Sequence, residues 1–196
     1  MRNISILFPV LLSTILVAVP CYAVTFEVRQ LTDNATDDGY PSLYGETIAW
    51  DGWDGNDGEI YYWDGTNIMQ ITNNDVDDWH PSLYKGTIAW NGWDGNDGEI
   101  YYWDGINIMQ ITNNDVDDWY PSLYNGTIAW HGWDGNDWEV YYWDGSNIAL
   151  VTNNNTDGGH ASLYGNSVAW DEWDGTDTEI YYAGIISYTY VGDDSG

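Results

Sequence analysis

Apolar and polar positions along this chain follow a pattern that repeats every 40 residues. Short runs of Ile, Val, Tyr and Trp are separated by clusters of Gly, Asp and Asn. Such runs predict β-strands bounded by turns, and the frequent Gly, Asp and Asn argue against helices. A Pro-Ser-Leu-Tyr motif shows the period, since it returns with little change at residues 41–44, 81–84, 121–124 and 161–164. The period therefore predicts four copies of one β unit.

The first unit is expected to contain four short strands that end at turns rich in Gly, Asp or Asn. The expected strands are residues 41–44, 47–50, 59–63 and 67–72. In the third strand, neighbours such as Ile60 and Tyr61 point to opposite faces, so both faces of the sheet are apolar or aromatic. A sheet of this kind has to be covered on both faces. We therefore predict an all-β protein, a β-propeller of four stacked, four-stranded blades of about 40 residues each.

The repeat places the propeller at residues 24–191 and leaves residues 192–196 as a tail. The predicted blades are about 40–79, 80–119, 120–159 and 160–191. Residues 26–32 resemble the fourth strand of the later units, so this N-terminal strand is expected to complete the last blade and protect its edge. Residues 185–191 compete for the same position, and the sequence leaves both alternatives open.

Residues 1–23 have the features of a secretory signal peptide. Arg2 precedes an apolar run at 4–19, and small residues precede a cleavage site after Ala23. The apolar run is shorter than the roughly 20 residues that a membrane-spanning helix needs. We expect cleavage, a mature chain with neither a transmembrane anchor nor a cysteine, and a periplasmic or extracellular location.

Charge narrows the range of partners. The chain has 32 Asp and Glu against 3 Lys and Arg, a formal net charge of −29. A surface this negative repels phosphate backbones, which argues against nucleic-acid binding and against binding to anionic membranes. The expected partner is a protein or a glycan at the cell surface or in the periplasm. The sequence leaves the oligomeric state open.

Four segments of the repeat carry a resemblance to a known family. They are Ile-Ala-Trp at 48–50, Asp-Gly-Asn at 54–56, Glu-Ile-Tyr at 59–61 and Gln-Ile-Thr at 70–72. In this order they resemble the WD40-like (PD40-type) repeat of TolB-like β-propellers. The resemblance implies a propeller fold and a non-catalytic role, as in envelope components, surface proteins and the propellers attached to peptidases. The chain departs from the family in having four repeats where six or more are usual.

No set of residues stands out as catalytic. His80 and His160 share one repeat position with Tyr40 and Tyr120, and His131 stands at another variable position. A Ser recurs in every unit at the position of Ser42, which is typical of a structural strand position rather than of a unique nucleophile. We therefore expect a protein that is not an enzyme. A propeller that forms part of a larger hydrolase or peptidase-like protein is an alternative.

Calcium is the one cofactor for which the sequence offers ligands. The linker after each fourth strand has oxygen-bearing side chains at alternate positions, as calcium loops do. These candidate ligands are Asn73, Asp75, Asp77, Asn113, Asp115, Asp117, Asn153, Asn155 and Asp157. The loop at 51–58 is also acidic, but its spacing does not match that of an EF-hand. The alternative is that Asp, Asn and Gly only form turns.

Tryptophans outside the expected strands are candidates for ligand binding. They are Trp53, Trp93, Trp133, Trp173, Trp79 and Trp119. An exposed Trp beside Asp and Asn suits a sugar ring or a protein hot spot, and repeated copies would make a multivalent lectin. The alternative is that each Trp folds over the edge of its own blade.

Overall fold

A computed structural model describes residues 24–185 of the chain. The chain divides into two units, Met1–Asp33 and Asn34–Gly196, and every described strand lies in the second. Residues 26–32 form no strand, which corrects the expectation of a closing strand: without a partner strand to pair with, this segment remains coil, exposed at 26–30 and half-buried at 31–32. The expected signal peptide, the competing segment beyond Ile185 and the tail at 192–196 lie outside the described residues.

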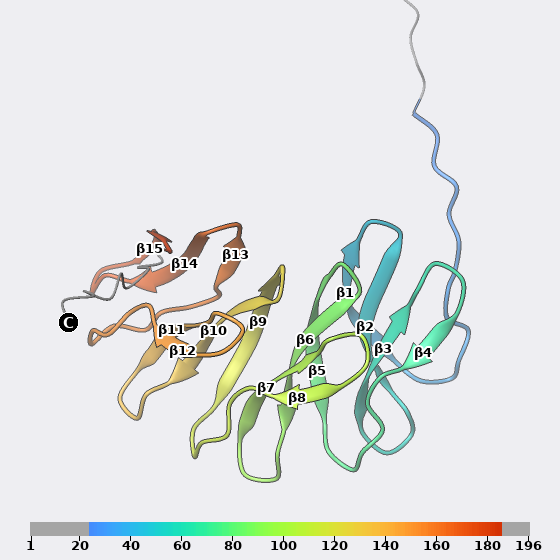
Figure 1. The fold of residues 1–196 in the computed structure, drawn as a ribbon, viewed down its shortest axis with the longest axis horizontal. Coiled ribbons are helices and arrows are strands. Elements are labelled where there is room, and N and C mark those ends of the chain that lie inside the picture. The colour runs from blue at the N-terminus through green and yellow to red at the C-terminus, as the bar shows by residue number, and fades with distance from the viewer. Residues whose placement is uncertain (1–23, 186–196) are drawn as a thin grey trace, which may run out of the picture. The chain divides into compact units, whose positions relative to one another are not determined.

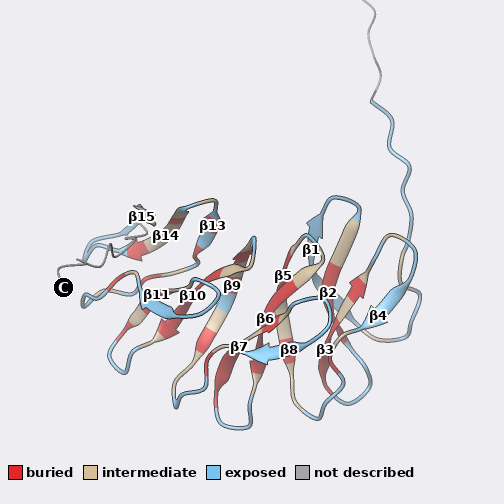
Figure 2. Cartoon of the chain, in the orientation of Figure 1, coloured by how far each residue is buried: buried red, intermediate tan, exposed pale blue. Residues whose placement is uncertain are grey.

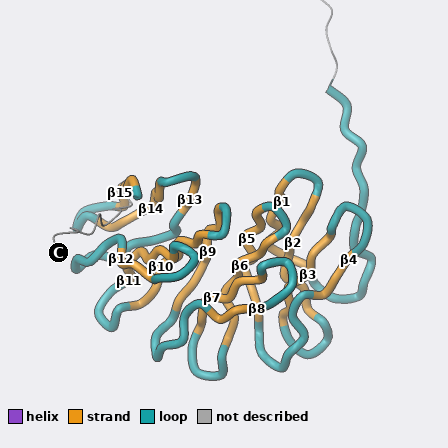
Figure 3. The backbone as a smooth tube through the Cα atoms, viewed as in Figure 1, coloured by secondary structure: helices purple, strands orange, loops and turns teal. Residues whose placement is uncertain are grey.

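The second unit contains four antiparallel sheets, called here blades 1 to 4, whose strands are hydrogen-bonded in chain order (Figure 1). Blade 1 contains β1 (Asp38–Tyr44), β2 (Thr47–Trp53), β3 (Gly58–Trp63) and β4 (Ile68–Gln70). Blade 2 contains β5 (Asp78–Tyr84), β6 (Thr87–Trp93), β7 (Gly98–Trp103) and β8 (Ile108–Gln110). Blade 3 contains β9 (Asp118–Tyr124), β10 (Thr127–Trp133), β11 (Trp138–Trp143) and β12 (Ile148–Leu150). Blade 4 contains β13 (Ser162–Tyr164), β14 (Ser167–Trp173) and β15 (Thr178–Gly184). No described residue is helical (Figure 3).

Turn residues explain where the strands end. Lys85 and Gly86 join β5 to β6, and both have positive φ, 50° and 78°, as a two-residue hairpin turn of type I′ requires. In the loop after β2, Asp54 Oδ1 accepts hydrogen bonds from the backbone N–H groups of Asn56 and Asp57, at 2.8 and 3.3 Å. These bonds close the loop in each repeat, so the expected role of Asp in turns is confirmed.

The hydrophobic core is divided into clusters between successive blades. The first cluster joins Ala49, Ile60 and Tyr62 of blade 1 to Leu83, Ile88 and Trp90 of blade 2. Equivalent residues form a second cluster between blades 2 and 3 and a third between blades 3 and 4. In Figure 2 the buried residues accordingly follow the inner strands of the stacked blades, whereas β8 and β12 are exposed. The prediction of stacked blades is confirmed, and each apolar face that meets a neighbouring blade is covered by it.

The first and last blades each keep one uncovered face. Leu43 in β1 is 68% exposed, whereas Leu83, at the same repeat position in β5, is 5% exposed. Ile180 in β15 is 78% exposed, whereas its counterpart Ile60 in β3 is fully buried. Blades 1 and 4 share no described core cluster, so the row of four blades is open among the described residues.

Side-chain hydroxyls connect the blades and fasten their outer strands. Ser42 Oγ accepts a hydrogen bond of 2.9 Å from the backbone N–H of Leu83 in the next blade, and the two following junctions repeat this bond. Within blade 1, Thr72 Oγ1 accepts a buried bond of 2.8 Å from the backbone N–H of Ile60. The repeated Ser therefore has the structural role expected of it.

A buried carboxylate lies against the indole of a core Trp. Trp90 Nε1 donates to Asp78 Oδ1 at 2.7 Å, and Asn74 Nδ2 donates to Asp78 Oδ2 at 2.9 Å. Burial, which these hydrogen bonds only partly offset, raises the pKa of Asp78 from 3.8 to about 6. Asp118, its counterpart in blade 3, has a pKa raised to about 6 for the same reason.

Stability is therefore expected to fall as the pH rises from about 4 to about 7. In this window the folded chain retains protons on Asp78 and Asp118 that the unfolded chain has released, so stability that is fully present below pH 4 is lost as the pH passes the folded pKa values. The loss is about 3 kcal/mol per carboxylate at most. Thermal unfolding followed by circular dichroism in a chelator-containing buffer measures it. In the variant D78N/D118N, stability should depend less steeply on pH. An identical slope of stability against pH in both proteins would contradict the assignment of the loss to Asp78 and Asp118.

Candidate functional site

A groove crosses the first strands of all four blades. It has a volume of about 390 Å³. Its lining repeats the same three positions of the unit: Tyr40, Pro41, Ser42, His80, Pro81, Ser82, Tyr120, Pro121, Ser122, His160 and Ala161. Because every blade contributes to it, the groove exists only when the blades are stacked.

A β-bulge in each of the first three blades turns an aromatic side chain into this groove. The pairing of β1 with β2 shifts register between Gly39 and Ser42, and β5 and β9 show the same shift. The bulged residues Tyr40, His80 and Tyr120 have φ values of 44°, 54° and 52°. This left-handed conformation is uncommon for bulky residues and costs on the order of 1–3 kcal/mol each. Such strain is typical of functional positions.

The bulged side chains form a row, called here the aromatic ladder: Tyr40, His80, Tyr120 and His160. Ring centroids lie 4.4 Å apart for Tyr40 and His80, 4.2 Å for His80 and Tyr120, and 5.0 Å for Tyr120 and His160. Tyr40, Tyr120 and His160 are exposed. The sequence marked this repeat position as variable, and the structure shows that Tyr and His alternate there as one continuous stack.

A neighbouring cavity of about 560 Å³ shares part of the ladder. In it the ring of His131 lies 5.5 Å from that of His160, whose Nδ1 is 3.6 Å from Asp171 Oδ1. Burial, together with the positive charge that His160 can carry, lowers the pKa of His131 to about 4, so this imidazole is neutral at pH 7. Sequence reasoning missed this pair, because the two His residues stand at different repeat positions.

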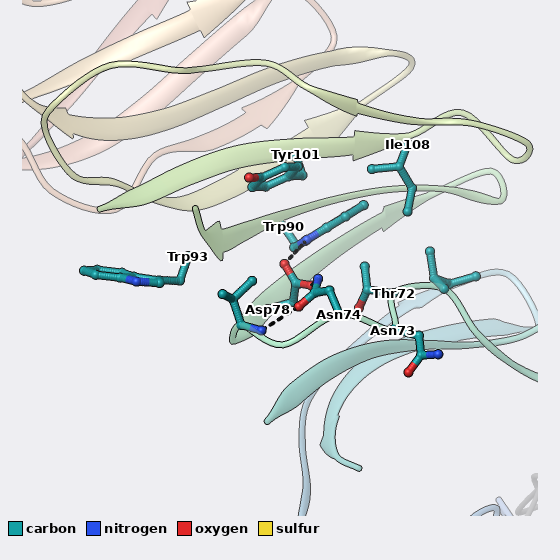
Figure 4. A pocket seen from close by; sticks show the side chains of 10 residues that line it. Thr72, Asn73, Asn74, Asp78, Trp90, Trp93, Tyr101 and Ile108 are labelled. Atoms are coloured by element: carbon teal, nitrogen blue, oxygen red, sulfur yellow. Dashed lines mark hydrogen bonds between the residues drawn. The ribbon is translucent and has the colours of Figure 1, made fainter. Parts of the chain in front are cut away.

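A third pocket, of about 410 Å³, lies between blades 1 and 2 and is shown in Figure 4. Its wall combines Trp90, Trp93 and Tyr101 of blade 2 with Asn73 and other residues of the linker before β5. One predicted ligand-binding Trp and one predicted metal-ligating Asn thus lie in the same pocket.

The predicted ligand-binding Trp residues lie in strands, which corrects the expectation that they lie in loops. Trp53, Trp93, Trp133 and Trp173 are the last residues of the second strands. Trp79 and Trp119 lie in β5 and β9, with rings 6.2 Å apart, and a Cβ added at Gly58 or Gly98 would meet them. The strands are longer than expected because the Asp-Gly and Gly-Trp segments still pair across the sheet. A ligand-binding role for these six residues stays a prediction.

The linker residues predicted to bind calcium do not form a carboxylate cluster by themselves. Asp77 Oδ1 instead accepts a hydrogen bond of 2.9 Å from the backbone N–H of Gly58, and Asp117 and Asp157 make the same contact with the preceding blade. Asn73 and Asp75 are exposed. Calcium binding by this set stays a prediction, although the linkers lie against a different group of acids in the preceding loops.

No family model and no curated protein matches this sequence. Solved structures do match the fold of this chain. The β-propeller domain of the trilobed protease from Pyrococcus furiosus, described as having an open velcro topology, matches with a TM-score of 0.60 at 13% identity over 77% of this chain and 52% of its own. The acylaminoacyl peptidase of Pyrococcus horikoshii matches with a TM-score of 0.56 at 14% identity over 76% of this chain and 27% of its own.

A putative TolB from Agrobacterium tumefaciens matches with a TM-score of 0.51 at 15% identity over 80% of this chain and 61% of its own. The fold is a β-propeller. It is of the kind found in TolB and in the propellers of peptidases, as the sequence resemblance implied. The chain spans about half of the trilobed protease propeller and about a quarter of the acylaminoacyl peptidase. Among residues 24–185, none belongs to an apolar helix long enough to cross a bilayer.

Proposed function

We propose that this chain is a non-catalytic propeller that binds a cationic polypeptide segment along the aromatic ladder, outside the cytoplasm. The observation that carries the proposal is the stack of Tyr40, His80, Tyr120 and His160, three of them exposed, in a groove to which all four blades contribute. Three of its members are held in a strained backbone conformation. A fold alone does not maintain such strain without compensation, which favours a binding role for the groove.

Charge supports a cationic partner. The net charge of −29 attracts Lys and Arg side chains over long distances and accelerates their association. At close range, Tyr faces contribute cation–π attraction of about 0.5–2 kcal/mol per contact. A row of rings about 4–5 Å apart suits an extended segment better than a compact small molecule.

The test compares two aromatic rows of the same blades. Peptides of eight to ten residues that alternate Arg with Tyr or Gly serve as probes, and binding is followed by isothermal titration calorimetry. The variant H80A/Y120A should lower the affinity at least about tenfold, as loss of central aromatic contacts does. Tyr84 and Tyr124 form a second stack, with centroids 4.6 Å apart, outside the groove. The control variant Y84A/Y124A should change the affinity less than about twofold, and an equal loss in both variants would reject the groove as the site.

A second candidate is carbohydrate binding, which the pocket in Figure 4 favours because Trp93, Tyr101 and Asn73 all line it. Aromatic rings stack on sugar faces and amides bond to hydroxyls. A glycan array tests this candidate, and the absence of any bound glycan would remove it. A role as the propeller of a larger peptidase-like protein is the third alternative, and it is supported only by the likeness of fold.

A further inference from the structure

Three carboxylates come together at the same place in every blade. In each cluster the two Asp residues lie in the loop after the second strand, and the Glu is the second residue of the third strand. One oxygen of each residue lies within 4.8 Å of those of the other two. The clusters are Asp54–Asp57–Glu59, Asp94–Asp97–Glu99, Asp134–Asp137–Glu139 and Asp174–Asp177–Glu179.

In the first three blades, two acids of each cluster are buried and have at least one carboxylate oxygen without a hydrogen-bond partner. Asp57 is 5% exposed, and neither of its carboxylate oxygens has a hydrogen-bond partner among the described residues. Glu59 is fully buried, and its Oε2 is also without a partner. In blade 3 both carboxylate oxygens of Asp137 and Oε2 of Glu139 lack a partner in the same way. In blade 2, Asp97 Oδ1 and Glu99 Oε2 lack a partner, whereas Asp97 Oδ2 accepts a bond of 3.1 Å from Asn96 Nδ2. An unpaired buried carboxylate costs several kcal/mol, so three blades that repeat this cost indicate a missing counter-charge.

The chain has few cations of its own compared with the number of these carboxylates. It contains 3 Lys and Arg residues, whereas the clusters hold three carboxylates in each of four blades. Lys85 lies elsewhere, 5.2 Å from the centroid of the Tyr84 ring. Burial first, and then the charges of Asp54 and the other neighbouring carboxylates, raise the pKa of Asp57. Burial therefore disfavours the charged form of these acids, and a bound cation would favour it.

The following linker covers each buried cluster. The backbone N–H of Asn74 donates to Glu59 Oε1 at 2.7 Å, and the backbone N–H of Gly58, between Asp57 and Glu59, donates to Asp77 at 2.9 Å. Blade 4 provides the contrast, since no described linker follows it and its three acids are all exposed. The same local sequence therefore forms a buried cluster only where the linker to a following blade covers it.

We propose that the three buried clusters, centred on Asp57, Asp97 and Asp137, each bind a calcium ion. Calcium takes six to eight oxygen ligands at about 2.3–2.6 Å, so two ligands on opposite sides of the ion are about 5 Å apart. The spacing within 4.8 Å agrees with this geometry. The all-oxygen donor set suits a hard cation and not zinc, which prefers Cys and His. The ion would join the loop after the second strand to the third strand of the same blade, at the place that the following linker covers.

The test uses two triple variants that remove the same charge. The variant D57N/D97N/D137N changes the buried acids. The control D64N/D104N/D144N changes three exposed Asp residues of the next turn. Their side chains accept hydrogen bonds within tight turns, chiefly from backbone N–H groups, and these bonds lower their pKa values. Calcium binding is measured by isothermal titration calorimetry on chelator-treated protein, and thermal unfolding is measured in calcium and in EGTA.

The unaltered chain and the control should bind about three calcium ions tightly and gain about 5–10 °C in midpoint at a hundredfold excess over the dissociation constant. The variant with the buried acids changed should lose both effects and, in EGTA, melt above the unaltered chain, because Asn removes an unpaired buried charge. No heat of binding to the unaltered chain would overturn the proposal. So would an equal midpoint shift in both triple variants, or an equal shift from sodium chloride at the same ionic strength, since either indicates charge screening only.

Discussion

The variant Gly92→Glu is expected to unfold at a much lower urea concentration than the unaltered chain, and adding Asp78→Gly should restore most of the loss. Gly92 in β6 pairs with Asp78 in β5, and even a Cβ at Gly92 would overlap Asp78 Oδ1. A Glu there would place a second carboxylate in a buried position that already holds one. We expect a loss of about 4 kcal/mol or more.

Blade 4 explains why the double variant should recover. There the pair is exchanged: Gly158 stands opposite Glu172 across the sheet. Glu172 Oε2 accepts from Trp170 Nε1 at 2.7 Å, the same length as the bond from Trp90 to its Asp in blade 2. Asn154 Nδ2 donates to the other oxygen of Glu172 at 2.8 Å. The carboxylate therefore satisfies the same two donors from the opposite strand.

A double-mutant cycle measures this exchange. Asp78→Gly alone leaves the Trp90 indole N–H and the Asn74 amide without their acceptor, which costs about 2–4 kcal/mol. The double variant D78G/G92E should lie within about 1 kcal/mol of the unaltered chain, a large favourable coupling energy. Additive losses would show that the exchange in blade 4 depends on other residues of that blade.

The second large effect is expected for Leu123→Ala, compared with Leu43→Ala. The two residues occupy the same position of the same motif, but Leu123 is 5% exposed between blades 2 and 3, whereas Leu43 is 68% exposed on blade 1. Truncation at Leu123 should cost about 2–5 kcal/mol because it leaves a cavity in the core. Truncation at Leu43 should cost less than about 0.5 kcal/mol.

Urea unfolding followed by Trp fluorescence measures both free energies of unfolding. The pair also tests whether the row of blades is open in solution. A loss at Leu43 as large as the loss at Leu123 would show that the first face of blade 1 is covered, either by blade 4 in a closed ring or by another segment. Each substitution is matched to the other in residue type and in its immediate sequence neighbours.

Local chemistry made much of the fold predictable. Strand residues such as Ile60 and Tyr61 alternate over a pleated sheet, and Asp54 closes its own loop through bonds to residues two and three positions away. Such patterns act within one repeat, so they can be read from a single copy. The expected N-terminal strand at 26–32 had the correct pattern and still did not form, because a strand also requires a partner edge.

The candidate sites were less predictable, because their members come together only through neighbouring blades. His80 and Tyr120 are 40 positions apart, and their stacking depends on how one blade packs on the next. Asp57 was visible as an acid of the predicted loop and Glu59 as the first residue of a predicted strand, but their burial depends on a linker that begins more than ten residues later. Among the linker acids that matched a calcium pattern, the last Asp of each linker accepts a bond from the first residue of the third strand of the preceding blade.

The amino-acid sequence by itself determined the number of repeats, the strand order within each blade and the presence of two apolar faces, because these follow from local periodicity and turn residues. Only the tertiary structure decided which of four nearly identical copies is buried and which is exposed. The physical reason is that burial is a property of a pair of blades. A neighbouring blade covers Leu123 but not Leu43, which occupies the same repeat position. In the same way, a linker covers Glu139 but not Glu179.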